Sequence, residues 1–285
     1  MLPVPSSKAV PFFLPGSRGD LFAVYYPPQH PPARGGILYV HAFAEEANWS
    51  RPTIAGVARA IARLGYGVLT VDLYGCGESA GEFRDARWEG WHEDLLLALQ
   101  WLQDRNLPQV GLWGLRLGAL LALDFAGRSQ RPFPFIILWH PPSSGKDALT
   151  QFLRLSLVQA TTNAGSRMTT KNLRNKLASG ICVEVAGWEL NPELAVAMER
   201  LDLSSLISQV SSSIYWIQFA QSAPATEQDV PHSRQRIFQA CEANGVALDF
   251  RHLTVRTFWA DRAQMTDDSQ VLIDAMNSIL TRHER

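Results

Sequence analysis

Residues 114–118 read Gly114-Leu115-Arg116-Leu117-Gly118. Two glycines around one central residue are typical of a nucleophile elbow, the strained strand-to-helix turn that holds a catalytic serine over the end of a sheet. The glycines are needed where the backbone is too tight for a β-carbon. Here the central residue is Arg116, whose guanidinium has only donors and stays protonated, so it cannot replace the attacking serine. The motif therefore predicts a fold more clearly than a reaction.

A second motif has the form D-x-x-G-x-G-x-S and is made by Asp72, Gly75, Gly77 and Ser79. It matches the turn that follows the fourth strand of α/β-hydrolases, where glycines permit turns and polar groups bind backbone. We interpret it as a fold element that says little about substrate. Cys76 within it is an alternative nucleophile, although no histidine is evidently placed to activate its thiol.

The segment from His41 to Glu46 follows a buried strand, at the place of the oxyanion loop of the same fold. There, backbone N–H groups of Ala42 or Phe43 and of Leu117 would bind a developing negative charge. The alternative is that this segment only forms a tight turn between a strand and a helix.

The other members of a serine-hydrolase triad are missing or unclear. Glu227 or Asp229 is near enough to a strand end to be the acid, but residues 254–259, after the last strand, contain no histidine. Loss of a triad nucleophile lowers turnover by about six orders of magnitude. A site without serine and histidine should not perform serine-type acyl transfer at a useful rate.

Two further histidines and two hydroxyls remain as candidates. His252 lies within a strand pattern and is interpreted as a packed core residue. His140 ends the strand beside the elbow strand, where it either supports that strand end or acts as an acid or base. Ser143 and Ser144 are the hydroxyls to test as substitute nucleophiles.

Buried strands alternate with amphipathic helices around these motifs, which predicts an α/β-hydrolase fold with a mostly parallel, doubly wound sheet. Ligands of such sheets bind outside the carboxyl ends of the strands, where the motifs fall. Strands are predicted at 36–40, 66–71, 110–113, 135–139, 214–219 and 246–253, and helices at 50–64 (with Ser50 as cap and Pro52 in the first turn), 85–105, 117–126 and 271–280.

Residues 1–285 are predicted to form one domain, with a helical cap insertion at about 146–206 where the alternation breaks. Residues 146–180 have a net charge of +5, from Lys146, Arg154, Arg167, Lys171, Arg174 and Lys176 against Asp147.

Composition excludes several classes of protein. The formal charge of −1 gives no reason to expect nucleic acid as a partner. Cys76, Cys182 and Cys241 are too few and too widely spaced to suggest disulfides or a metal cluster, and no cofactor is expected. No apolar run reaches transmembrane or signal-peptide length, so a cytoplasmic protein without an integral membrane segment is predicted.

Together, several stretches resemble the exosortase A system-associated hydrolase 2 family of the α/β-hydrolase superfamily. The resemblance implies that Arg116 is the family's own pattern, and that the setting is a bacterium that makes exopolysaccharide and sorts PEP-CTERM proteins through a membrane exosortase. It implies no substrate, and residues 254–257 depart from the Gly and Pro usual there. The matching stretches are Pro11–Leu14, His41–Arg51, Asp72–Trp91, Trp113–Asp124, Ser144–Leu155 and Phe258-Trp259.

A buried guanidinium at the elbow needs compensation, because an unpaired buried charge is costly. Water, a carboxylate such as Glu45 or Glu46, or an anionic ligand at the helix N-terminus would supply it. Two functions follow. One is an enzyme with a non-serine mechanism, Arg116 being the oxyanion-type group and His140 or a carboxylate the base. The other is a catalytically inactive module that binds a phosphate or carboxylate metabolite or a partner protein, with a possible link to the exosortase machinery.

Overall fold

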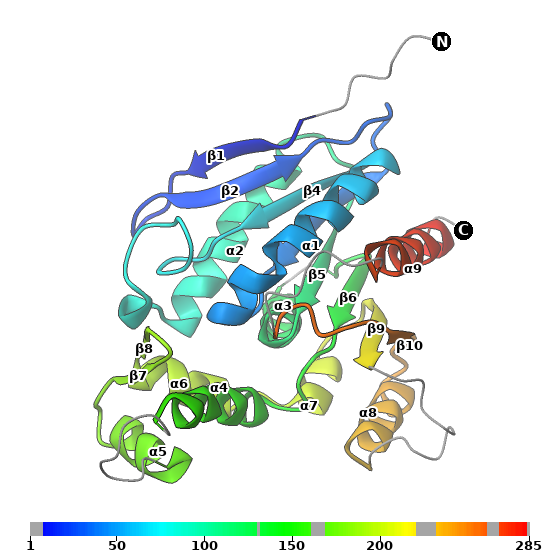
Figure 1. Ribbon diagram of the computed structural model, residues 1–285. Coiled ribbons are helices and arrows are strands. Elements are labelled where there is room, and N and C mark those ends of the chain that lie inside the picture. Colours follow the sequence, from blue (N-terminus) through cyan, green and yellow to red (C-terminus); the bar gives the residue numbers. More distant parts are fainter. Residues whose placement is uncertain (1–7, 130–131, 161–168, 221–231, 261–267, 284–285) are drawn as a thin grey trace.

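The computed structural model describes residues 8–129, 132–160, 169–220, 232–260 and 268–283, and its centre is one eight-stranded sheet (Figure 1). The strand order is β1-β2-β4-β3-β5-β6-β9-β10. From β4 to β10 all neighbours run parallel, whereas β1, β2 and β4 pair antiparallel. The bounds are β1 Val10–Leu14, β2 Leu21–Tyr26, β3 Gly35–Val40, β4 Tyr66–Val71, β5 Val110–Leu115, β6 Phe135–Trp139, β9 Ser213–Ala220 and β10 Leu248–Thr254.

Helices cover both faces of this sheet. On one face, α1 (Glu45–Arg63) lies beside α9 (Asp268–His283), and their apolar side chains share a core with Trp113 and Trp139. The opposite core receives α2 (Trp88–Gln103), α3 (Leu117–Arg128), α7 (Leu203–Ile207) and α8 (His232–Ala243). Two cores separated by a sheet buried on both faces explain why the central strands read as continuous apolar runs.

The described residues between β6 and β9 form four helices and a short hairpin, and we refer to them as the α4–α7 segment. In Figure 1 its first elements lie below the ends of the central strands. Arg87 pairs with Glu193 at 2.8 Å and Arg84 with Glu189 at 3.2 Å, so the turn around η1 (Phe83–Asp85) is tied to this segment. Its elements are α4 Gly145–Ala160, α5 Thr170–Ala178, β7 Val183–Val185, β8 Trp188–Leu190, α6 Pro192–Glu199 and α7.

One of the basic side chains of residues 146–180 forms an ion pair within the fold. Arg174 forms an ion pair with Glu199 and donates to Thr150 Oγ1 at 2.7 Å. Arg167 lies outside the described residues. Arg174 therefore has a structural role within the segment.

The first helix begins earlier than the sequence pattern indicates. It starts at Glu45, directly after Ala44 (φ 51°), and Pro52 lies inside it. The prediction of Ser50 as the cap is wrong: its hydroxyl donates back to Ala47 O at 3.0 Å from within the helix. The two carboxylates of Glu45 and Glu46 consequently occupy the first helical turn, beside the site.

The N-terminal strands were not predicted. In β2, buried side chains alternate with half-buried ones, as expected for a strand with one partly covered face. Phe13 of β1 is 57% exposed, and its edge has no further strand among the described parts of the chain. None of the helices described is long and apolar enough to cross a membrane.

Candidate functional site

Arg116 stands at the turn between β5 and α3 with φ 57° and ψ −123°, a conformation that non-glycine residues rarely adopt. A β-carbon at Gly114 would lie 2.5 Å from Ala119 Cα, and one at Gly118 would collide with the carbonyls of Val40 and His41. The two flanking glycines are therefore required by close backbone packing. The elbow geometry is confirmed, with a guanidinium in place of the nucleophile.

The guanidinium of Arg116 points into the protein, and the residue is only 8% exposed. Its Nε donates to Glu46 Oε1 at 3.1 Å, and its Nη2 donates to Gln151 Oε1 of α4 at 2.5 Å. Nη1 lies 3.4 Å from the carbonyl of His140. The ring of Trp259 lies 5.5 Å from Cζ, within cation–π distance. Protein groups thus supply the compensation that a buried cation needs.

Glu46, rather than Glu45, is the carboxylate that forms an ion pair with Arg116. Burial raises the pKa of Glu46, and the charge and hydrogen bond of Arg116 offset part of that rise. Glu45 Oε2 instead accepts from Asn48 at 3.2 Å and from the indole of Trp188 at 3.4 Å. The two neighbouring carboxylates therefore face different partners.

His140 supports the end of β6. Its backbone (φ 46°) donates to Ile217 O at 2.8 Å, and Nδ1 accepts from the N–H of Phe219 at 3.2 Å. The amide of Gln218 lies 3.0 Å from the same nitrogen, and the ring packs 4.9 Å from that of Trp259. A ring nitrogen that accepts from backbone is poorly placed to take a substrate proton, so the contacts favour the supporting role.

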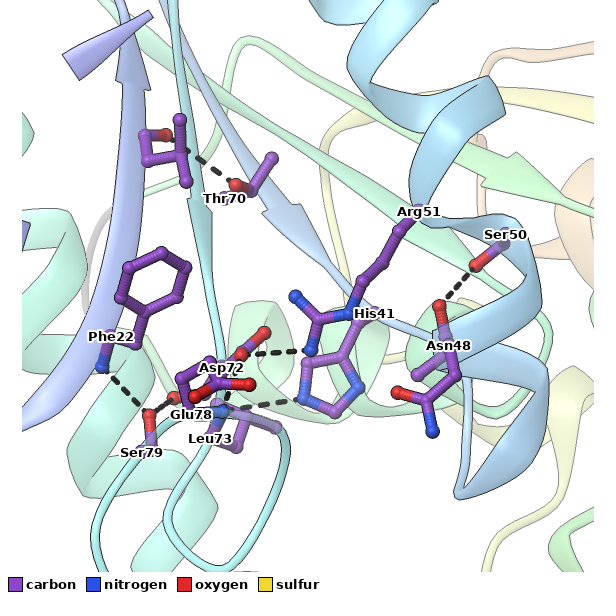
Figure 2. Close-up of polar contacts among 12 residues, drawn as sticks. Phe22, His41, Asn48, Ser50, Arg51, Thr70, Asp72, Leu73, Glu78 and Ser79 are labelled. Atoms are coloured by element: carbon purple, nitrogen blue, oxygen red, sulfur yellow. Dashed lines mark hydrogen bonds and ion pairs between the residues drawn. The ribbon is translucent and has the colours of Figure 1, made fainter. Parts of the chain in front are cut away.

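His41 has both ring nitrogens bound to backbone. Nδ1 lies 2.6 Å from Ala42 O, so it donates. Nε2 accepts from the N–H of Leu73 at 3.2 Å, as Figure 2 shows. Burial lowers the pKa of His41, although Asp72 acts in the opposite direction. The ring is therefore a neutral link between the ends of β3 and β4, and not a base.

This link predicts a pH dependence of stability. Because the folded pKa of His41 lies below its ordinary value near 6.5, the unfolded chain takes up the proton first as the pH falls. The stabilising contribution is complete above about pH 6.5 and decreases below it, by up to ~1.4 kcal/mol per pH unit. In urea unfolding between pH 5 and 8, His41→Gln should flatten this slope. The matched change at exposed His30 should leave the slope intact, and an unchanged slope in His41→Gln would contradict the assignment.

The D-x-x-G-x-G-x-S turn is structural, as the sequence indicates. Gly75 and Gly77 have φ values of 78° and 57°. Ser79 Oγ donates to Asp72 O at 2.5 Å and accepts from Phe22 N at 2.8 Å, which ties the turn to β2 (Figure 2). Cys76 inside it is buried, and burial together with nearby carboxylates raises the pKa of its thiol. That rise disfavours a nucleophilic thiolate.

Ser144 caps α4. Its hydroxyl accepts from the N–H of Asp147 at 3.1 Å and donates to the carboxylate of the same residue at 2.9 Å. The first of these bonds is that of an N-cap, which satisfies a free N–H of the first helical turn. Exposed Ser143 contributes its carbonyl, which accepts from Leu203 N at 3.1 Å. The contacts described for both serines are structural.

Ser144→Ala is expected to lower the free energy of unfolding by about 1 kcal/mol, because the first turn of α4 loses its cap. Chemical denaturation would measure it, with Ser143→Ala as the matched control that changes stability little. A loss of function without a loss of stability in Ser144→Ala would instead favour a chemical role for this hydroxyl.

A pocket of about 170 Å³ lies beside Arg116, at the carboxyl ends of β3 and β5. Of the predicted oxyanion-loop residues, Phe43 and Leu117 line it, whereas Ala42 does not. Trp259 comes from the loop after β10, where a triad histidine would be expected. Glu227 and Asp229 lie outside the described residues, and His252 is half-buried in β10, not fully in a core. The lining residues are Phe43, Glu45, Glu46, Trp49, Arg116, Leu117, Ala148, Gln151, Phe152, Leu155, Trp259 and Ala260.

Gln151 and Trp259 were not singled out as site residues from the sequence. Gln151 lies in a helix whose pattern carries no signal of a ligand, and Trp259 lies in the loop after the last strand, where a triad would have its histidine. The resemblance to the exosortase-associated family, which includes both positions, was the one available pointer. No group of His, Cys, Asp and Glu side chains among the described residues is arranged to hold a metal ion.

A comparison with protein families matches residues 31–186, over half of the chain, to the family described as "Serine aminopeptidase, S33". The chain belongs to this family. The match includes the elbow, so this member of a serine hydrolase family has arginine at the serine position. No curated protein matches the sequence.

Solved α/β-hydrolases share the fold. Est1E from Butyrivibrio proteoclasticus, in a structure with bound ferulic acid, has 13% identity and a TM-score of 0.69, over 95% of this chain and 98% of that one. An esterase from Pyrococcus furiosus has 12% identity and a TM-score of 0.62, over 98% and 91%. Proline iminopeptidase from Mycobacterium smegmatis has 12% identity and a TM-score of 0.61, over 96% and 98%. At these identities the likeness concerns the fold alone.

Proposed function

We propose that this protein is a non-hydrolytic member of the α/β-hydrolase fold that binds a small anionic metabolite in the pocket beside Arg116. The observation that carries the proposal is the occupied elbow: the guanidinium of Arg116 is held by Glu46 and Gln151 and covered by Trp259. A nucleophile and a general base would be needed at those places for acyl transfer. A pre-oriented cation is suited to binding.

Carboxylate and phosphate are the ligand groups that a guanidinium fork recognises best. Three of the five N–H groups of Arg116 make hydrogen bonds with described residues, and Arg116 is one of the residues that line the pocket. The carboxylate of Glu46 would repel an anionic ligand, but burial disfavours the ionised form of Glu46. We propose that the ligand anion displaces Glu46 from Arg116. The apolar lining suits a short hydrocarbon part, and the biological setting follows the resemblance to exosortase-associated proteins.

Calorimetry with short-chain phosphate monoesters and carboxylates tests the proposal. Arg116→Ala should weaken binding at least tenfold, because a charge-assisted pair is lost, whereas Glu46→Gln should strengthen it. Equal binding by wild type, Arg116→Ala and Arg116→Ser would exclude the anion site.

The competing function is an enzyme with a non-serine mechanism, with the carboxyl of Glu46 as acid or base. The raised pKa of Glu46 beside Arg116 favours it, since perturbed groups gather at reactive sites. A fluorophosphonate probe and a chromogenic ester panel separate the functions. Silence in both, with tight anion binding, supports the binding module. Labelling of Ser79, Ser143 or Ser144 by the probe would instead identify a serine nucleophile and support conventional hydrolysis.

A further inference from the structure

The apolar part of the pocket beside Arg116 is bounded largely by aromatic rings. Its four aromatic lining residues come from four segments of the chain: the turn before α1, α1 itself, α4 and the loop after β10. In that order they are Phe43, Trp49, Phe152 and Trp259. The first and third are 6% exposed, the last is 4% exposed, and Trp49 is half-buried. The remaining apolar lining residues are Leu117, Ala148, Leu155 and Ala260.

Helical spacing explains why rings and polar groups meet in this pocket. On α1, Glu46 and Trp49 are three residues apart and lie on one face of the helix. On α4, Ala148, Gln151 and Leu155 are spaced by three and four residues and also share a face, with Phe152 beside it. Each helix therefore brings one polar group, bound to Arg116, and one aromatic ring to the same pocket.

Contacts outside the pocket hold two of the rings in place. The ring of Phe43 packs edge-on against that of Phe152, with centroids 5.0 Å apart and planes at 79°, and against that of Phe83 at 5.4 Å. The ring of Trp259 lies 4.9 Å from that of His140. Walls that are fixed before a ligand arrives reduce the ordering cost of binding. An incoming group therefore meets aromatic surfaces of defined orientation.

The volume of the pocket limits what these walls can enclose. It is about 170 Å³. An apolar protein cavity of about 150 Å³ is large enough to bind benzene. The pocket is therefore the right size for one six-membered ring with a small substituent, and too small to enclose a long acyl chain.

We infer that the ligand of this pocket is a small aromatic acid of the benzoate type, with its ring among Phe43, Trp49 and Phe152 and its anionic group toward Arg116. Ring pairs in edge-to-face or offset geometry add attraction beyond the burial of apolar area, and a saturated ring of the same size lacks this gain. The position of the anion rests on the function proposed above, whereas the preference for an aromatic ring can be measured without it.

Four probes separate the two questions. Benzoate and cyclohexanecarboxylate have the same charge but differ in the ring, and benzamide and cyclohexanecarboxamide are their neutral counterparts. Dissociation constants come from ligand-observed NMR titrations of the wild type. Each aromatic probe should bind about tenfold more tightly than its saturated counterpart. The ratio of benzoate to benzamide measures the anion site separately.

Variants locate the ring in this pocket. Phe152→Leu and Trp49→Leu keep an apolar side chain but remove one ring each, so each should lower the aromatic preference about threefold. The matched control is Phe125→Leu on α3, because Phe125 is also 6% exposed but does not line the pocket. It should leave the preference unchanged. Thermal unfolding checks that each variant is folded, and half-buried Trp49 keeps the test valid if Phe152→Leu does not fold.

The outcomes distinguish this inference from the proposed function. Equal binding of benzoate and cyclohexanecarboxylate, both tighter than the amides, would overturn the aromatic class and leave the anion site standing. Equal binding of benzoate and benzamide, both tighter than the saturated probes, would support the aromatic class and remove the anion site. No binding of any probe would overturn the inference, as would a preference that Trp49→Leu and folded Phe152→Leu leave unchanged.

Discussion

Arg116→Ala is expected to lower the free energy of unfolding by about 3 kcal/mol. Removal of one partner from a buried ion pair leaves the other charge uncompensated, which costs about 3–5 kcal/mol. Glu46 is that partner here, and its side chain is 28% exposed, so the lower end of the range applies. Gln151 loses a hydrogen bond, and Trp259 loses the cation that lies over its ring. Urea unfolding at neutral pH measures the sum.

A double-mutant cycle isolates the pair. Arg116→Ala/Glu46→Ala should be less destabilised than the two single changes summed, with a coupling of about 1–3 kcal/mol. The matched control is the cycle on Arg87 and Glu193, which pair at 2.8 Å but are 36% and 76% exposed. That coupling should remain below about 1 kcal/mol. Equal couplings in the two cycles would mean that burial of the Arg116–Glu46 pair has no energetic importance.

The pH dependence of the stability of Arg116→Ala is an independent test of the ion pair. In the wild type, burial raises the pKa of Glu46, and Arg116 lowers it by a smaller amount. Without it, the folded pKa of Glu46 rises further above the value of the unfolded chain, near 4.5. A raised carboxyl pKa favours folding below the unfolded value and loses that contribution as the pH rises through the folded pKa. The deficit of Arg116→Ala should therefore be smaller at pH 4 than at pH 7.

Local signals in the sequence were sufficient for the centre of the fold. The buried runs of β3, β4, β5 and β6 are continuous because helices cover both faces of the sheet, and such runs are visible without tertiary knowledge. The glycines at 114, 118, 75 and 77 likewise record backbone constraints that only glycine meets. Elbow and turn were therefore predicted from residue type and spacing alone.

Contacts between distant segments were beyond local signals. Glu46 was one of two carboxylates expected to compensate Arg116, and the structure selects it. Gln151 meets Arg116 across 35 residues, and no spacing rule connects these two. Ser50 and Pro52 form a reasonable helix start on propensity, yet the strained turn at Ala44 begins the helix earlier. The strands of β1 and β2 have short, partly exposed patterns, and Trp101 of α2 packs against Phe12 from far along the chain. These features follow from packing, which a single sequence does not show.

Serine at the elbow is not expected to restore hydrolysis by itself. In Arg116→Ser, the chromogenic ester rate should stay within about tenfold of wild type, because the hydroxyl lacks an imidazole to remove its proton. Trp259 lines the same pocket from the loop after β10. Arg116→Ser/Trp259→His should therefore raise the rate by about 10²–10⁴, the usual contribution of general base catalysis, and should allow fluorophosphonate labelling of position 116.

The neighbour of Trp259 supplies the control for that double change. Phe258 packs against Trp139 and Phe219 and does not line the pocket, so Arg116→Ser/Phe258→His should stay inactive although it adds the same imidazole. Glu46→Gln is added to each of these double variants. It removes a carboxylate that would no longer be paired with Arg116 and would repel the oxyanion. Activity in Arg116→Ser alone would show that a base already faces the elbow, and His140 would then be the first residue to replace. No activity in Arg116→Ser/Trp259→His, with the fold intact, would mean that an imidazole at position 259 is not placed to take the proton of a hydroxyl at position 116.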